Sequence, residues 1–472
     1  SPANGEFVWR MEDVLEVYTR PYDPKRPQVC MDETSKQLLR DVCTPQPVQP
    51  GRPARVDYEY ERGVVVNLFL FCEPLAGRRW VDVTEHRTKP AVPFGGGYRL
   101  IDFVLSNLVN SKVHQIYVLT QYKAQSLLTH LQQGWVGTYP MNGLFILPVP
   151  AQMRVSETWY QGTADAIFQN IYLIQQTKPD LVLVFGADHV YFMDVSQMIR
   201  YHLQKEADVT IATIPYPITE CSQFGVVVVN EQWRVKNFQE KVPHPTPIPG
   251  QPDKGLVSMG NYIFNTDVLI EAVLNDTADD ESSHDFGRDI LPRIFEASNV
   301  YAYDFRRNNV PGMPVSNDYW RDVGTIKSFY DANMDLKNPL PQLNLYNAQW
   351  PVRSVKHHDP PAKVVIDTSG RAGLVENSLV VGRSIIAGGY VCNSIIGRNV
   401  YIASGAQVED AVILGHAVIQ EGAKVRRAII DHGNIVARKE EIGYDRERDM
   451  DRYYVDESGI VVTHRREYKG MT

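Results

Sequence analysis

Long hydrophobic runs are absent from this sequence of 472 residues. The longest, VVVNLFLF at Val64–Phe71, is far shorter than the roughly 20 apolar residues that a membrane-spanning helix needs, so we expect no such helix. Cysteine is also scarce, and the five cysteines form neither a CxxC pair nor a zinc-site spacing. Their scatter predicts a reducing, cytoplasmic setting; the positions are Cys30, Cys43, Cys72, Cys221 and Cys392.

An excess of positive charge is missing as well. The formal net charge is −8 at pH 7, so the chain as a whole offers no electrostatic attraction to nucleic acid, and we expect no nucleic-acid partner. Apolar residues make up 43% and charged residues 22%, which is ordinary for a soluble globular protein. The length predicts about two to four domains.

Three patterns follow one another along the chain. Residues 1–88 are rich in proline and arginine, with expected strands at Pro27–Met31 and Gly63–Phe71. Residues 89–345 alternate short apolar runs with stretches of helical periodicity. Near-continuous apolar strands between helices predict an α/β domain whose mostly parallel sheet is covered on both faces. The strands are expected at Gln115–Thr120, Leu181–Asp188, Asp208–Tyr216 and Gly225–Asn230, and the helices at Tyr122–Gln133 and Thr163–Gln176.

The last part of the chain has a different period. After a proline-rich connection, residues 346–365, large apolar residues recur at every sixth position. Such hexads predict a parallel β-helix over residues 366–440, in which each of these side chains points into a triangular prism. The alternative, an irregular β-sandwich, would not keep a six-residue register over four turns. Residues 441–472 form a charged tail, expected against or beyond the last coil. The hexad residues are Ile396, Ile402, Val408 and Leu414.

Two carboxylates are candidates for binding a cation. Asp188 ends an apolar strand in VFGADHVYFMD, and strand ends of a parallel sheet face the ligand crevice. Asp322 lies in DYWRDVGT, far along the chain. Together they could hold a hydrated Mg²⁺ that also contacts nucleotide phosphates. The simpler interpretation of Asp188 is an acidic helix cap, and spacing alone does not establish the pairing.

Other residues could bind phosphate or sugar. Lys241 and Glu240 follow a strand-like stretch, where a lysine suits a sugar phosphate and a glutamate suits sugar hydroxyls, although most such neighbours are solvated surface pairs. Gly162 and Thr163 let the backbone approach a ligand, and the helix expected from Ala164 offers free N–H groups.

The motifs from Lys89 onward occur together in one known family. KPAVPFGGGYRLIDF, WYQGTADAIFQN, GADHVY, FQEK, SMGNYIF, SSHDFGRDILP, YWRDVGT and the hexads resemble bacterial glucose-1-phosphate adenylyltransferases from Thr84 or Lys89 to the C-terminus. The resemblance implies a Rossmann-like nucleotidyltransferase domain followed by a left-handed β-helix. It also implies that ATP and glucose 1-phosphate are joined to ADP-glucose and pyrophosphate with Mg²⁺, by a homotetramer.

Carried onto this sequence, the resemblance assigns roles residue by residue. Asp188 and Asp322 correspond to the metal-holding aspartates, and Asp188 with Lys89 to the catalytic pair. Gly162 and Thr163 remain candidates for the nucleotide. The sugar-phosphate and product contacts implied are Tyr160, Gly225, Glu240, Lys241 and Ser258.

The family's first strand and glycine-rich phosphate loop are not recognisable. The loop has the form LAGGxGTRL, whose bare backbone cradles phosphates. This chain instead has CEPLAGRRWVDV, Cys72–Val83, which keeps only Gly77 and places Arg78, Arg79 and Trp80 beside it. Arg79 does precede Lys89 by ten residues, the separation between the family's loop arginine and that lysine. The apolar run Val64–Phe71 could replace the missing strand. We interpret both features as coincidences. Otherwise the sheet would have unpaired backbone at its centre.

Residues 14–88 resemble part of the DDE transposases of insertion sequences, with Asp32 matching the first of three metal-binding acids. A solvated strand end is the favoured interpretation of Asp32, since the other two acids do not appear. TEHRTK therefore marks a junction, which recombination, insertion or an error of sequence assembly would produce. We expect a nucleotidyltransferase with reduced or no activity; the alternative is a non-catalytic sugar-phosphate-binding subunit that assembles with an intact homologue.

Overall fold

The computed structural model describes residues 87–136, 145–152, 159–314 and 318–463, and the backbone of three earlier strands. These strands are β1 (Leu39–Asp41), β2 (Tyr60–Arg62) and β3 (Val66–Phe71). Several expected features lie outside the described residues: the strand Pro27–Met31, Asp32, the glycine-poor stretch Cys72–Val83 and the first half of the TEHRTK junction, residues 84–86.

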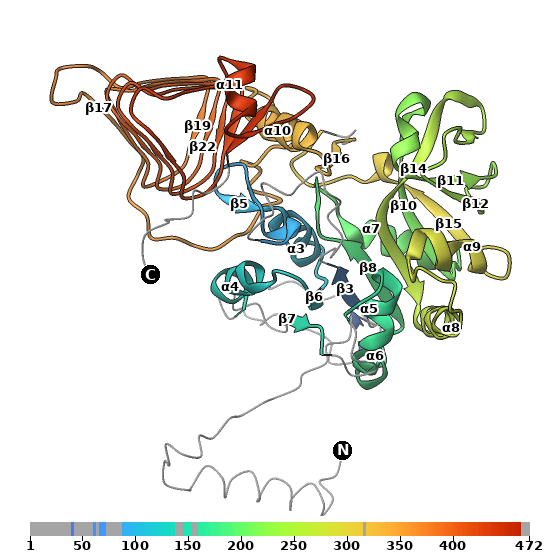
Figure 1. Ribbon diagram of the computed structural model, residues 1–472. Helices are drawn as coiled ribbons and strands as arrows, with labels where there is room; N and C mark the ends of the chain where they lie inside the picture. The colour runs from blue at the N-terminus through green and yellow to red at the C-terminus, as the bar shows by residue number, and fades with distance from the viewer. Residues whose placement is uncertain are drawn as a thin grey trace, which may run out of the picture. The chain divides into compact units, whose positions relative to one another are not determined.

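A ten-stranded sheet is the centre of the α/β part (Figure 1). Besides β3 it contains β6 (Gln115–Thr120), β7 (Phe145–Pro150), β8 (Leu181–Gly186), β10 (Val209–Pro217), β11 (Gly225–Val229), β12 (Val235–Glu240), β13 (Pro247–Ile248), β14 (Gln251–Asn265) and β15 (Val300–Asp304). The order is β12-β11-β14-β8-β3-β6-β7, with β10 and β13 beside β14 and β15 beside β10. Strands β7, β6, β3 and β8 are parallel, whereas β14 is antiparallel to its neighbours. All four strands expected between residues 115 and 230 are confirmed.

Helices cover both faces of this sheet. They are α3 (Leu100–Asn110), α4 (Gln125–Gly134), α5 (Thr163–Gln169), α6 (Ile171–Thr177), α7 (Val195–Gln204), α8 (Thr266–Thr277) and α9 (Leu291–Ile294), with short turns η2 (Lys89–Ala91), η3 (Ile218–Gln223), η4 (Phe286–Ile290) and η5 (Phe305–Arg307). Alternate residues of β6 enter separate cores. Ile116 and Val118 pack with α3 and α4, while Tyr117 and Leu119 pack with α5, α6 and α8. The expected helix Thr163–Gln176 is divided at Asn170 into α5 and α6.

Strand β3 fills the centre of the sheet. Its backbone pairs in parallel with β6, Leu68 opposite Ile116, and with β8, Leu68 opposite Leu183. The interpretation of the apolar run at Val64–Phe71 as a coincidence is therefore wrong, and the sheet has no gap between β6 and β8. A run of apolar and β-prone residues satisfies the backbone of a central strand whatever its origin.

The C-terminal part is the expected parallel β-helix. Three stacks of short strands form its sides: β17-β20-β23-β26-β29, β18-β21-β24-β27-β30 and β19-β22-β25-β28-β32-β31. They run from β17 (Lys363–Val365), β18 (Leu374–Glu376) and β19 (Leu379–Val380) to β29 (Ile435–Val436), β30 (Glu441–Ile442), β31 (Tyr454–Val455) and β32 (Val461–Thr463). Between them lie β20 (Ile385–Ala387), β21 (Tyr390–Cys392), β22 (Ile395–Ile396), β23 (Tyr401–Ile402), β24 (Gln407–Glu409), β25 (Val412–Ile413), β26 (Val418–Ile419), β27 (Lys424–Arg426) and β28 (Ala428–Ile430). Helix α11 (Arg446–Met450) precedes β31, so the charged tail contributes strands to the third side.

One residue of the expected hexad lies elsewhere. Ile396, Ile402 and Val408 are buried in the core of the prism, but there the fourth position belongs to Ile413. Leu414 is buried instead among residues of the nucleotidyltransferase part, including Phe329 of α10 (Ile326–Asp335). Because Ile396 pairs with Ile413, the coil repeats after 17 residues rather than 18, and the six-residue count overshoots by one.

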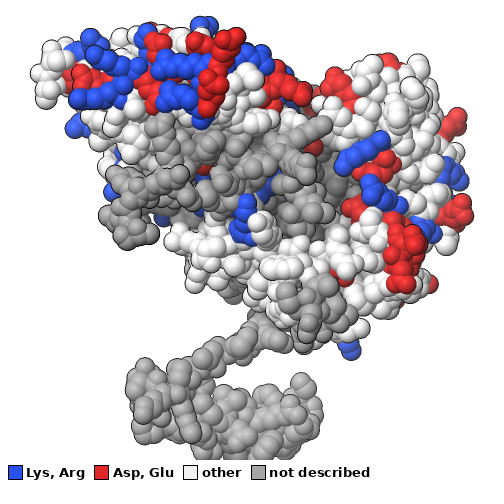
Figure 2. Space-filling model, viewed as in Figure 1, with Lys and Arg blue, Asp and Glu red and all other residues white. Residues whose placement is uncertain are grey.

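The β-helix and the α/β part share a core cluster and many hydrogen bonds. Arg87 donates two hydrogen bonds to the carboxylate of Asp431, and the connection around Trp350 bonds to α3. On the face drawn in Figure 2, basic and acidic side chains alternate over the β-helix. Within the described residues, no helix has the length and apolar character to cross a membrane.

Candidate active site

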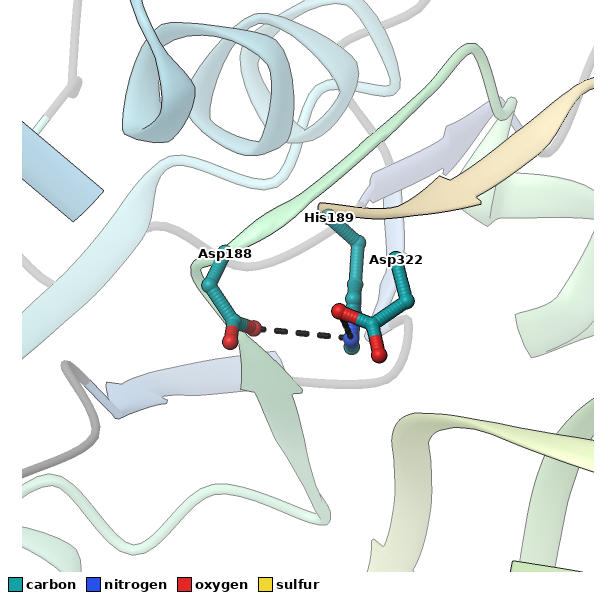
Figure 3. Close-up of side chains that lie close together, drawn as sticks. All are labelled: Asp188, His189 and Asp322. Atoms are coloured by element: carbon teal, nitrogen blue, oxygen red, sulfur yellow. Dashed lines mark ion pairs between the residues drawn. The ribbon is translucent and has the colours of Figure 1, made fainter. Parts of the chain in front are cut away.

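Asp188 and Asp322 come together through a small two-stranded sheet. Strand β9 (His189–Tyr191) follows Asp188 directly, and β16 (Trp320–Asp322) pairs antiparallel with it, placing Asp322 opposite His189. Figure 3 shows the three side chains converging. One ligand atom from each of Asp188, His189 and Asp322 lies within 4.8 Å of the others. A pair of carboxylates far apart in sequence thus faces a common point.

Lys89 lies between these two carboxylates. It begins the short turn η2 and is buried, with its Nζ 2.6 Å from Asp188 Oδ2 and 3.6 Å from Asp322 Oδ1. Burial alone would raise the pKa of Asp188, but the charges of Lys89 and His189 and the hydrogen bond from Lys89 outweigh it and lower that pKa. Asp188 is therefore ionised at neutral pH.

His189 is a site residue to which the sequence assigned no role. Its Nε2 lies 3.5 Å from Asp188 Oδ1 and 3.9 Å from Asp322 Oδ1, and its ring packs 5.1 Å from that of Trp320. No feature of GADHVY distinguishes a site histidine from a packed one. Only the pairing of β9 with β16 brings it to the second carboxylate.

A pocket of about 220 Å³ opens beside the carboxylates. It is lined by five predicted residues, Thr163, Asp188, Gly225, Glu240 and Ser258. Also in its wall are Tyr262, Asp285, Phe286 and Trp320, of which the sequence offered no sign beyond their occurrence in family motifs. A second, wider pocket of about 680 Å³ adjoins it across Phe224 and Trp320 and is lined by Lys241 and Asp322.

Glu240 and Lys241 lie at the end of β12, in a tightly packed corner. Gly225 pairs with Glu240, and a Cβ at Gly225 would come 2.5 Å from Cζ of the packed Phe238 ring and 2.8 Å from Glu240 Oε2, so a larger residue would displace that ring. Burial raises the pKa of Glu240, although the neighbouring Lys241 lowers it in part. Lys241 Nζ is 3.4 Å from Glu240 Oε1, with 64% of the lysine side chain exposed to the wider pocket.

The segment from Tyr160 to Thr163 serves mainly internal contacts. Tyr160 is buried, accepts a hydrogen bond from Asn170 and lines neither pocket. Gly162 is pressed against the loop before η4, because a Cβ there would meet the His284 carbonyl at 2.2 Å. The Ala164 N–H, expected to be free, donates to that same carbonyl at 2.8 Å. Of this segment only Thr163 reaches a pocket.

Comparisons with known proteins place the chain among relatives over most of its length. The family described as nucleotidyl transferase matches residues 76–339, and that described as GlmU-like, C-terminal hexapeptide matches residues 360–463. The first match begins at Ala76, earlier than the boundary at Thr84 expected from the motifs.

Curated relatives named glucose-1-phosphate adenylyltransferase are similar over more than four-fifths of the chain. The protein of Thermus thermophilus is 47% identical over 392 residues, covering 82% of this chain and 95% of its own. The protein of Aliivibrio fischeri is 45% identical, covering 84% and 96%, and that of Thermodesulfovibrio yellowstonii 43%, covering 82% and 93%.

Proposed function

Because the chain belongs to the nucleotidyl transferase family, and within it to the glucose-1-phosphate adenylyltransferases, we propose that it joins ATP and glucose 1-phosphate to give ADP-glucose and pyrophosphate. The observation that carries the proposal is the meeting of Asp188, Asp322 and Lys89 beside a pocket that contains Glu240 and Ser258. Carboxylates for a cation and polar groups for a sugar thus share one cleft.

Asp188 and Asp322 fit a divalent cation, which we propose to be Mg²⁺. Both present carboxylate oxygens, the ligands that hard cations prefer, and the buried Asp322 Oδ1 has no hydrogen-bond partner among the described residues. When bound, the cation would neutralise phosphate charge during transfer. Lys89 keeps Asp188 ionised and adds a second positive charge at the same point.

The remaining residues bind and orient the substrates. Lys241 is exposed in the wider pocket and supplies a positive charge for the phosphate of the sugar. Glu240 and Ser258 offer acceptors to sugar hydroxyls in the smaller pocket, and Gly225 keeps that corner open. Thr163 lines the smaller pocket at the proposed nucleotide side, and Tyr160 and Gly162, which line neither pocket, hold the segment that carries it in place.

The proposed enzyme turns over slowly because its nucleotide loop keeps only Gly77 of the family's glycines. Arg78, Arg79 and Trp80 stand where the family has small residues whose backbone N–H groups approach phosphates. The same substitutions support a second candidate, a subunit that binds sugar phosphate without turnover and assembles with an intact homologue.

The proposal also covers the division of the chain into domains, its oligomeric state and its location. We assign residues 1–88 to a transposase-like fragment that supplies β3, residues 89–345 to the nucleotidyltransferase domain and residues 346–365 to a connection. The β-helix is assigned to residues 366–440, and the tail, residues 441–472, adds β31 and β32 to its third side. We propose a homotetramer located in the cytoplasm. The free thiols of Cys221 and Cys392 are in keeping with the reducing setting of that location.

Binding of glucose 1-phosphate by calorimetry tests the sugar site. We expect Lys241→Gln to weaken binding about 10- to 100-fold, the loss of one charge-assisted hydrogen bond. Lys327→Gln is the matched control, because Lys327 lines the same wider pocket, is 60% exposed and pairs with Asp331. If both variants bind like the unaltered chain, or if the unaltered chain does not bind, the assignment of the sugar-phosphate site is wrong.

A further inference from the structure

Both proposed metal carboxylates are carried by one two-stranded sheet. Strands β9 and β16 pair with each other and with no strand of the ten-stranded sheet. Asp188 immediately precedes β9, and Asp322 is the last residue of β16. Asp188 is also joined to β8 (Leu181–Gly186) through Ala187, whereas Asp322 follows β9 through the pairing of the two strands, so a shift of β9 relative to β8 changes the separation of Asp188 and Asp322.

The side chain of Asn107 holds the end of β9. Its Nδ2 donates to the carbonyl of Tyr191 at 3.0 Å, and its Oδ1 accepts from the N–H of Met193 at 3.1 Å. One amide thus binds the main chain at two points two residues apart, as a neighbouring strand would. Asn107 is 1% exposed, so no water competes for these bonds.

A third hydrogen bond orients the amide itself. Trp350 Nε1 donates to Asn107 Oδ1 at 3.0 Å, from the connection that leads to the β-helix. The same connection bonds to α3 at Ser106, whose hydroxyl accepts from the N–H of Arg353 at 2.8 Å. The amide of Asn107 is thereby held by the connection as well as by β9.

We propose that Asn107 is a positioning residue for the divalent cation: its amide clamps β9 through Tyr191 and Met193 and so sets the separation of Asp188 and Asp322. The inference rests on the metal site of the proposed function. Mg²⁺ requires oxygens at about 2.1 Å in near-octahedral positions, so small changes in the separation of two carboxylates reduce affinity strongly. Groups that orient ligands without touching the metal typically change affinity about 10- to 100-fold.

Binding of Mn²⁺ to the full chain, followed by electron paramagnetic resonance, tests the inference without requiring turnover. In Asn107→Asp the donor to the Tyr191 carbonyl is lost, while an oxygen for Met193 and Trp350 remains. We expect this variant to bind Mn²⁺ about 10- to 100-fold more weakly. Trp350→Phe keeps an aromatic side chain but removes the Nε1–H group and so the third bond, and we expect a smaller loss of affinity, within about tenfold.

Ser106→Ala is the matched control. It removes one buried hydrogen bond between the same connection and the neighbouring residue of α3, but none to β9. We expect its melting temperature to fall while its affinity for Mn²⁺ stays unchanged. If Asn107 served stability alone, Asn107→Asp would likewise lower the melting temperature without weakening the binding of Mn²⁺. The inference is overturned if Asn107→Asp binds Mn²⁺ as tightly as Ser106→Ala. Where Asn107→Asp does not fold, unchanged affinity in Trp350→Phe overturns it.

Failure of the metal site itself gives a different result. If the unaltered chain binds no Mn²⁺, or if Asp322→Asn binds it equally well, the proposed function loses its cation site whatever Asn107 does. The inference about Asn107 fails alone when Asp322→Asn abolishes binding and Asn107→Asp leaves it intact.

Discussion

Glu240 is subject to opposing influences at the residue scale. Burial raises its pKa, the nearby Asp285 raises it further, and Lys241 and Arg288 lower it, with a raised pKa as the net result. The carboxylate is thus protonated at a higher pH than an ordinary glutamate. Since a protonated carboxyl is a poorer acceptor for sugar hydroxyls, the pocket should lose affinity at a higher pH than that at which an ordinary glutamate is protonated.

The affinity for glucose 1-phosphate should therefore fall as pH falls through the raised pKa of Glu240. Measured by calorimetry, the loss between neutral and mildly acidic pH should be about tenfold, the value of one hydrogen bond to a charged group. Glu240→Gln should show only the change caused by titration of the substrate phosphate. Identical pH profiles for the two proteins would contradict the role given to Glu240.

The sequence allowed prediction of site residues where a strand end or a family motif marked them. Asp188, Glu240 and Ser258 do line one pocket, with Asp322 beside it. Asn107 and His189 could not be assigned roles in this way. The contacts of Asn107 with Tyr191 and Met193 join residues more than 80 positions apart, and no local pattern encodes them.

Strand β3 is the most informative feature at the element scale. It belongs to a segment with no recognisable family motif, yet its backbone lies between β6 and β8. Hydrogen bonding of a central strand depends on the main chain, so an apolar run without the family's motif satisfies the sheet. The nucleotide loop that should follow depends instead on bare glycines, of which Cys72–Val83 keeps only Gly77.

Leu68→Pro tests whether β3 stabilises the sheet by pairing with β6 and β8. Proline removes one N–H from a central strand, and we expect the free energy of unfolding in urea to fall by at least about 1–3 kcal/mol. Leu39→Pro is the control, since β1 pairs only with β2 among the described strands and should leave that free energy nearly unchanged. Equal effects of the two substitutions would show that β3 does not occupy the sheet.

Elements were predictable from sequence where apolar runs were short and continuous, as for β6, β8, β10 and β11. Strand β14 was not among the expected strands, because Pro252, Asp253 and Gly255 interrupt the apolar pattern of its 15 residues. The β-helix followed from its period, but a six-residue count cannot register the coil of 17 residues that displaces Leu414 from the prism. One residue fewer at a corner of the coil shifts the positions that point into the prism, although the amino-acid composition of the coil stays the same.

At the scale of the whole molecule, the β-helix and the catalytic part are continuous. Phe94, Phe103 and Phe329 of one pack with Ile395 and Val412 of the other in a single cluster. Arg87, two residues before Lys89, is bonded to Asp431 of the β-helix. The proposed cation and sugar sites therefore lie in a chain that has both parts of the family architecture, while the altered nucleotide loop is the part that departs from it.

The rate of ADP-glucose formation from ATP and glucose 1-phosphate with Mg²⁺, measured beside the Thermus thermophilus relative, tests this account most directly. We predict product at a rate at least about 100-fold lower, because loss of a single preorganised N–H donor to a reacting group typically costs about 100- to 1,000-fold. Binding of glucose 1-phosphate with no product would favour the non-catalytic subunit. Turnover equal to that of the relative would contradict the account, since the loop would then work without its glycines.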